Sequence, residues 1–117
     1  MAKKLSKYSE GDCLSMMLAV RDTLDVISGK WKLLIIISIN NGNKRFREIE
    51  RSIPKITSKV LAKELKDLEE HKLIKRTVYD DSPVLVEYTV TDYVKSLENL
   101  ILEMYKWGVG HRKKIIG

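Results

Sequence analysis

The chain has 117 residues, of which 44% are hydrophobic and 32% charged, a composition typical of one soluble globular domain. Its longest apolar run, residues 33–39, is far shorter than the ~20 residues that a membrane-spanning helix needs. The basic N-terminal residues lead into acidic ones, so we expect no secretory signal and a cytoplasmic protein. A single cysteine, Cys13, excludes an intrachain disulfide and argues against a cysteine-based metal site. The net charge of +6 favours nucleic acid as the acidic partner.

The N-terminal third of the chain predicts a flexible segment followed by two apolar elements. Residues 1–12 are polar and rich in lysine, and we expect them to precede a domain that spans residues 13–117. The apolar positions of residues 14–27 fit one or two short helical turns, which Gly29 is suited to end. Residues 31–39 are rich in β-branched side chains and fit either a buried strand or a helix buried on most sides. Periodicity alone does not decide between these two.

Two amphipathic helices are predicted next, one on each side of Pro54. The first is short, and its apolar residues Phe46, Ile49 and Ile53 share one face. The second follows a capping residue and directs a stripe of leucines inward. The candidate caps are Thr57 or Ser58, and the stripe consists of Leu61, Leu65 and Leu68.

Positive charge is concentrated on this helix pair. Residues 44–66 hold eight basic and three acidic residues, whereas residues 67–103 hold four basic and nine acidic ones. Charge focused in this way is expected of a module that grips a polyphosphate backbone. The alternative is that the two helices simply present a solvated surface.

The C-terminal part predicts a β-hairpin and a long helix. Two β-rich runs, residues 73–79 and 84–90, flank a turn at residues 80–83. Thr91 or Asp92 is suited to cap a final helix with a helical apolar pattern. The order helix, helix, short helix, basic helix, hairpin, long helix is that of a winged helix-turn-helix, a mainly α fold with a small β-hairpin wing.

Five short strings carry a family resemblance: Gly29-Lys30-Trp31, residues 45–49 (RFREI), residues 60–69 (VLAKELKDLE), residues 86–88 (VEY) with the following Thr91, and Trp107. Each string is weak alone. In this order and spacing they resemble the HxlR-type branch of the MarR-like winged helix-turn-helix bacterial transcription regulators, over most of the chain. The resemblance implies that residues 30–40 are helical and that the protein binds double-stranded DNA.

The resemblance also assigns roles to the basic residues. The helix that begins near residue 57 would be the recognition helix, whose N-terminal residues lie nearest the base edges in the major groove. Basic residues around it would hold the phosphate backbone, which positions the protein without specifying sequence. The wing tip is acidic at Asp80 and Asp81, so the root of the wing is the better contact. The candidate DNA-binding residues are Lys44, Arg45, Arg47, Arg51, Lys55, Thr57, Ser58, Lys59, Lys63, Lys66, Lys75 and Arg76, with an ion pair as the alternative role for Arg45.

Cys13 has two interpretations. In several members of the resembled family, a cysteine at the matching place senses oxidants or electrophiles. A reactive thiol needs exposure and a depressed pKa, whereas the neighbouring Glu10 and Asp12 oppose thiolate formation. The alternative is that Cys13 is a small packed hydrophobe.

A two-fold symmetric homodimer is expected from the apolar faces of the terminal helices. The face of the last helix is wider than one small domain needs to bury, and a second apolar surface lies near the N-terminus. A dimer would present two recognition helices to an inverted repeat. The candidate dimerisation residues are Leu14, Met17, Leu18, Leu97, Leu100, Ile101, Met104 and Trp107.

Together these features predict a sequence-specific DNA-binding transcription regulator, with repression as the favoured mode. The sequence has no constellation typical of a catalytic, metal or cofactor site, so we expect neither an enzyme nor a bound cofactor. A small molecule or an oxidant remains open as an effector. The alternatives are a basic protein that binds RNA or DNA without sequence preference and a winged-helix adaptor for protein contacts.

Overall fold

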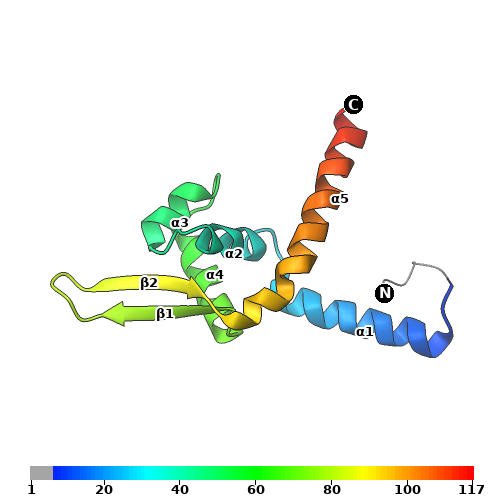
Figure 1. Cartoon of the computed structure of the whole chain (residues 1–117), viewed down its shortest axis with the longest axis horizontal. Helices are drawn as coiled ribbons and strands as arrows, with labels where there is room; N and C mark the ends of the chain where they lie inside the picture. The colour runs from blue at the N-terminus through cyan, green and yellow to red at the C-terminus, as the bar shows by residue number, and fades with distance from the viewer. Residues whose placement is uncertain (1–6) are drawn as a thin grey trace.

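The computed structural model describes residues 7–117 and consists of helices with one two-stranded antiparallel sheet (Figure 1). Residues 1–6, the first half of the expected flexible segment, lie outside the described residues. In chain order the elements are α1 (Glu10–Ile27), α2 (Lys32–Asn40), α3 (Phe46–Ser52), α4 (Ser58–Glu70), β1 (Ile74–Tyr79), β2 (Leu85–Val90), the 3-10 helix η1 (Asp92–Leu97) and α5 (Glu98–Ile116).

The hydrophobic core lies where α2, α3 and α4 meet the root of the hairpin. The three helices bury their apolar faces against one another, and the hairpin extends away from them while α1 and α5 project in other directions (Figure 1). The winged helix-turn-helix predicted from the sequence is therefore confirmed. The core residues are Ile35, Ile36, Ile39, Ile49, Ile53, Ile56, Leu61, Leu65, Leu68, Leu73, Ile74 and Val94.

The β-branched run that fitted either a strand or a helix forms α2. Ile35, Ile36 and Ile39 are buried, at the spacing of one helix face, whereas Leu34 and Ile37 are exposed. A buried strand would have been covered on both faces and would have left neither Leu34 nor Ile37 in solvent. The helical structure implied by the family resemblance is confirmed, and the strand alternative is wrong for this segment.

The hairpin is joined to the helices by backbone hydrogen bonds. Its two strands pair in register from Ile74 opposite Val90 to Tyr79 opposite Leu85. The Tyr88 amide donates to the carbonyl of Lys44, 2.7 Å away, so β2 also fixes the loop that leads into α3. This contact places the wing beside the entrance to the helix-turn-helix.

The first helix is longer than the short turns expected from the sequence. α1 is one continuous helix of 18 residues. The Ser9 hydroxyl caps it by accepting from the Asp12 amide at 3.2 Å, and acidic side chains in the first turn favour a helix start. The helix therefore begins at Glu10, and residues 10–12 do not belong to a flexible segment.

The final helix also differs from the prediction, because the chain first passes through the 3-10 helix η1. The Thr91 hydroxyl donates to the carbonyls of Lys72 and Leu73, at 2.8 and 3.2 Å, and so does not cap a helix. These bonds close the base of the hairpin. The α-helix α5 begins only at Glu98.

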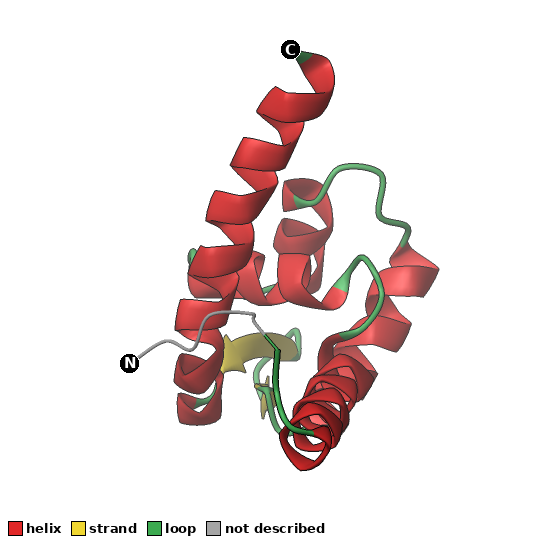
Figure 2. Ribbon diagram, turned by 90° about the vertical axis from the view of Figure 1, so that its right-hand side faces the viewer, coloured by secondary structure: helices red, strands yellow, loops and turns green. Residues whose placement is uncertain are grey.

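The two long helices make little contact with the core. α1 buries only Ile27 and α5 buries none of its residues. A view turned by 90° shows α5 upright along its length and α1 nearly end-on at the lower right, apart from α5 (Figure 2). No helix among the described residues is both long enough and apolar enough to cross a membrane.

The end of α4 carries a lysine in a backbone conformation that favours glycine. The Leu73 amide donates to the Leu68 carbonyl and the Lys72 amide to that of Glu69, which together form a Schellman motif. Lys72 has a φ of 61° at the position usually taken by glycine. A side chain in this left-handed conformation costs about 1 kcal/mol.

We expect Lys72→Gly to raise the free energy of unfolding by roughly 1 kcal/mol, because the strain is removed while the motif is kept. Urea unfolding monitored by circular dichroism measures the change. The matched control is Lys66→Gly inside α4, which we expect to destabilise the protein by about 1 kcal/mol. A lower urea midpoint for Lys72→Gly would contradict the prediction.

Candidate nucleic-acid interface

The basic face of α4 is built by its cap and its leucine stripe. The Thr57 hydroxyl accepts from the Val60 amide at 3.2 Å, which identifies Thr57 rather than Ser58 as the cap. Leu61, Leu65 and Leu68 are buried as predicted. Because these leucines fix the inner face, the lysines on the opposite face remain in solvent: Lys59, Lys63 and Lys66.

The start of α3 is fixed by a carboxylate. Glu48 Oε1 accepts from the backbone amides of Lys44 and Arg45, each at 3.1 Å. These two bonds, with smaller contributions from the charges of Arg45 and Arg51, lower the pKa of Glu48. The carboxylate thus orders the loop that carries two of the predicted phosphate contacts.

We expect Glu48→Gln to lower the free energy of unfolding at pH 7 and to have little effect in acid. A carboxylate whose pKa is lowered on folding stabilises the protein above about pH 4.3, the ordinary pKa of Glu, and this contribution is lost as the pH falls through the lower folded pKa. Urea unfolding at pH 7 and pH 3 tests this. Glu103→Gln, in an exposed ion pair with Lys106, is the control and should change stability little. A Glu48→Gln effect equal at both pH values would contradict the assignment.

All twelve candidate DNA-binding residues are exposed. They come from the loop before α3, from α3 itself, from the turn at Pro54, from α4 and from the root of β1. Among the described residues, Arg45 forms no ion pair with a carboxylate, and its charge has only the smaller effect on the pKa of Glu48 given above. Lys75 and Arg76 are consecutive in β1 and point to opposite faces of the hairpin, so only one of them can share a surface with α4.

Acidic residues of the helix pair are held by local partners. Glu50 of α3 accepts a hydrogen bond from the Ser58 hydroxyl, and its Oε1 lies 3.6 Å from Arg47 Nη1. On α4, Glu64 and Asp67 both face Lys32 of α2. These carboxylates therefore offset less of the exposed positive charge than the amino-acid composition of the two helices suggests.

Lys32, Glu48 and Glu50 were not among the residues singled out from the sequence. The sequence indicates only that Lys32 needs a partner, because it is a charged residue at the start of an apolar run. Its partners are 32 and 35 residues away along the chain, beyond the reach of helical periodicity.

The hairpin tip differs in character from the basic surface. Asp80 and Asp81 are exposed there, together with apolar Tyr79 and Val84. The structure thus places the acidic residues in solvent at the outer end of the wing, away from the helices (Figure 1).

The expected dimerisation residues fall into two groups. Leu14, Met17, Leu18, Leu100, Met104 and Trp107 are exposed on α1 and α5, with Trp107 70% exposed and stacked on His111 at a ring distance of 4.7 Å. Leu97 and Ile101 instead lie half-buried against the core of their own chain. These two residues therefore join the terminal helix to the winged domain.

Cys13 lies on α1 next to this apolar face, and its thiol is exposed. The alternative of a packed hydrophobe is wrong for the single chain. Between residues 7 and 117, no group of three or more Cys, His, Asp and Glu side chains is arranged to hold a metal ion.

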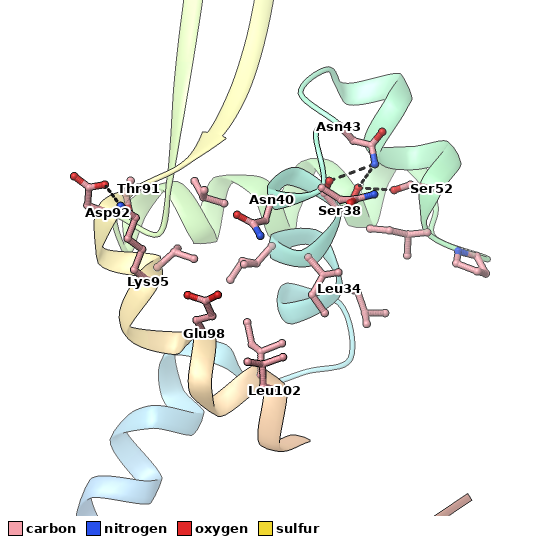
Figure 3. A pocket seen from close by; sticks show the side chains of 18 residues that line it. Leu34, Ser38, Asn40, Asn43, Ser52, Thr91, Asp92, Lys95, Glu98 and Leu102 are labelled. Atoms are coloured by element: carbon pink, nitrogen blue, oxygen red, sulfur yellow. Dashed lines mark hydrogen bonds and ion pairs between the residues drawn. The ribbon is translucent and has the colours of Figure 1, made fainter. Parts of the chain in front are cut away.

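A cavity of about 700 Å³ separates α2 from η1 and the start of α5. Leu34 and Leu102 lie on two sides of it, and Asn43, Ser38 and Ser52, joined by hydrogen bonds, lie at one end (Figure 3). The Ser38 hydroxyl accepts from Asn43 Nδ2 at 3.1 Å. The cavity therefore adjoins both the helix-turn-helix and the base of the terminal helix.

Comparison with known proteins places this architecture. Residues 26–115 match the HxlR-like helix-turn-helix family. The HTH-type transcriptional regulator YtcD of Bacillus subtilis strain 168 is 39% identical over 100 residues, 86% of this chain and 79% of its own. The structure of the redox regulator HypR in its reduced form superposes with a TM-score of 0.76 at 39% identity, covering 83% of this chain and 96% of that one. The reduced form of the regulator YodB from B. subtilis gives a TM-score of 0.68 at 36% identity, covering 76% and 87%.

Proposed function

Since the chain belongs to the HxlR-like helix-turn-helix family and is a transcription regulator of that type, we propose that it binds DNA sequence-specifically as a homodimeric repressor. The observation that carries this proposal is the exposed lysine face of α4, set directly opposite its buried leucines. A helix built in this way can enter the major groove with its first residues at the base edges. The exposed cations of α3 and the turn then hold the flanking phosphates.

The proposed homodimer uses the apolar faces that α1 and α5 leave in solvent. Leu14 is 54% exposed and Met104 49% exposed, and such faces on long helices are suited to pack against a second copy. Two-fold symmetry would set two recognition helices about 34 Å apart, one turn of DNA, opposite an inverted repeat.

Two measurements test the proposed function. Selection from a pool of random duplexes identifies the preferred sequence, and a competition gel shift compares it with random duplex. We expect an enriched inverted repeat, and light scattering should give twice the 13.5 kDa of one chain. Equal affinity for all duplexes would favour a non-specific RNA- or DNA-binding protein, and no binding at low salt would favour a protein-interaction adaptor. A mass of one chain with sequence-specific binding would exclude the dimer.

The response to oxidants is proposed to act through Cys13. This chain is similar in structure to the redox regulator HypR, and the Cys13 thiol is exposed near the proposed dimer face. A mixed disulfide and a Cys13–Cys13 bond between subunits are two reversible products open to a single cysteine. Either product would alter the packing of α1 at that face.

We expect a mild oxidant such as diamide to change the operator affinity of the wild type and not that of Cys13→Ser. The reason is that serine keeps the size of the residue but cannot form a disulfide. Gel shifts with and without oxidant, reversed by dithiothreitol, measure the response. Because the chain has one cysteine, an equal response in Cys13→Ser would exclude thiol sensing.

A small-molecule effector is the alternative to an oxidant. The cavity between α2 and α5 has the volume usual for small-molecule sites, about 300–1,000 Å³. A ligand there would contact the helix-turn-helix and the base of the terminal helix together. It could thus couple DNA binding to subunit arrangement.

A further inference from the structure

Lys32 joins the recognition helix to the rest of the domain through a nearly enclosed ion pair. Its Nζ lies 2.7 Å from Glu64 Oε2 and 3.6 Å from Asp67 Oδ2. Only 12% of the Lys32 side chain and 13% of the Glu64 side chain are exposed. The two carboxylates are three residues apart on α4, so one ammonium from α2 holds two successive turns of the recognition helix.

We propose that Lys32 is a positioning residue for DNA recognition: it fixes the rotation of α4 about its axis without touching DNA. The inference rests on the proposed function, because it assigns α4 to the major groove. Hydrophobic packing of the leucine stripe is non-directional and leaves small rotations open. A short ion pair on the flank of the helix is directional and restricts them.

The lysines that face solvent depend on this rotation. A side-chain tip lies about 5–6 Å from the axis of a helix, so a rotation of about 10° displaces it by about 1 Å. Recognition sites tolerate displacements of only about 0.5 Å and rotations of 10–20°. Lys63 directly precedes Glu64, so movement of the Glu64 carboxylate is transmitted to the lysine face.

The charge of α4 gives a second reason for the arrangement. The helix carries three lysines and four carboxylates and is by itself net negative. Lys32 supplies one positive charge against two of these carboxylates on the side that faces α2. Without it, Glu64 would be an unpaired charge with little access to water, and rotation of the helix toward solvent would relieve that penalty.

The test uses the 117-residue chain, the duplex selected by the wild type and a random duplex. The variants are Lys32→Met, Lys32→Arg, Glu64→Gln and the double variant Lys32→Met/Glu64→Gln. Lys106→Met is the control, because its ion pair with Glu103 is exposed on α5. Circular dichroism and urea unfolding establish that each variant is folded under the binding conditions.

We expect Lys32→Met to lower affinity for the selected duplex by about tenfold and affinity for random duplex by no more than about twofold. Random binding is expected to persist because it depends on the exposed cations, which are unchanged. Lys32→Arg should restore discrimination, since arginine can pair with both carboxylates. Glu64→Gln should also reduce discrimination between the selected and the random duplex. The double variant should discriminate at least as well as the single variant that discriminates less. Lys106→Met should bind like the wild type.

Three results would overturn the positioning role: unchanged discrimination in Lys32→Met, equal losses on both duplexes, or additive losses in the double variant. Equal losses would indicate a simple effect of net charge. If Lys32→Met does not fold, the Glu64→Gln variant alone decides. This variant keeps the Lys32–Asp67 pair, so Lys32 still has a partner. Discrimination equal to that of the wild type in Glu64→Gln would then overturn the positioning role. Failure of the proposed function is distinguishable, because the wild type itself would then select no sequence; that result would overturn the positioning role as well.

Discussion

Alanine in place of Lys63, on the outer face of α4, is expected to weaken operator binding more than alanine in place of Lys114 near the end of α5. Lys63 is exposed one turn from the start of the helix, where a side chain reaches the groove. If it touches a base edge, roughly 1–3 kcal/mol is lost and discrimination relaxes at one position of each half-site. If it touches phosphate, affinity falls for all sequences, and the salt slope of the dimer decreases by about two, one for each copy.

Gel shifts or fluorescence anisotropy at several salt concentrations measure both quantities. Lys114→Ala, in the last turn of α5, is the matched control because it removes one exposed charge far along the chain from the basic helix pair. We expect it to leave affinity and salt slope close to wild type. If Lys63→Ala also leaves both unchanged, α4 does not form the interface.

Leu61→Ala is expected to destabilise the fold by about 2–5 kcal/mol, the range for truncating a buried leucine. Leu61 is fully buried between α4 and the rest of the core. Its removal leaves a cavity beneath the lysine face, so we expect DNA affinity to fall with stability. Urea unfolding at one fixed protein concentration measures the change, since the stability of a dimer depends on concentration.

The control is Val84→Ala at the wing, where the side chain is mostly in solvent. We expect its effect to be within about 0.5 kcal/mol. If Leu61→Ala costs no more than Val84→Ala, the leucine stripe is not the support of the recognition helix.

The parts of the fold with a clear period could be predicted from the sequence. Leu61, Leu65 and Leu68 recur at helical spacing with a capping threonine before them, and both the helix and its buried face are confirmed. The hairpin could also be predicted from the sequence, because β-branched residues flank a turn that contains Pro83. In these segments local preference and burial agree.

Other features depended on contacts between distant segments. The apolar run in α2 has no unique period, and its helical structure follows from packing against α3, α4 and the hairpin. Threonine is a common helix-capping residue, but the Thr91 hydroxyl donates to the carbonyls of Lys72 and Leu73 instead. The sequence around Lys32 indicates that it needs a partner but not which residues supply it, and the Glu50–Ser58 bond leaves no local pattern.

The small burial of α1 also bears on how the protein would respond to its own abundance. An 18-residue helix that buries only Ile27 gains little stability from its own domain, whereas most helices in proteins owe their stability to tertiary packing. In the proposed dimer, the ordering of α1 would therefore accompany assembly. Occupancy of the operator would then rise steeply with the amount of protein, because two chains must meet before either is fully ordered. A gene controlled in this way would stay nearly unrepressed at low expression and be silenced over a narrow range of protein concentration.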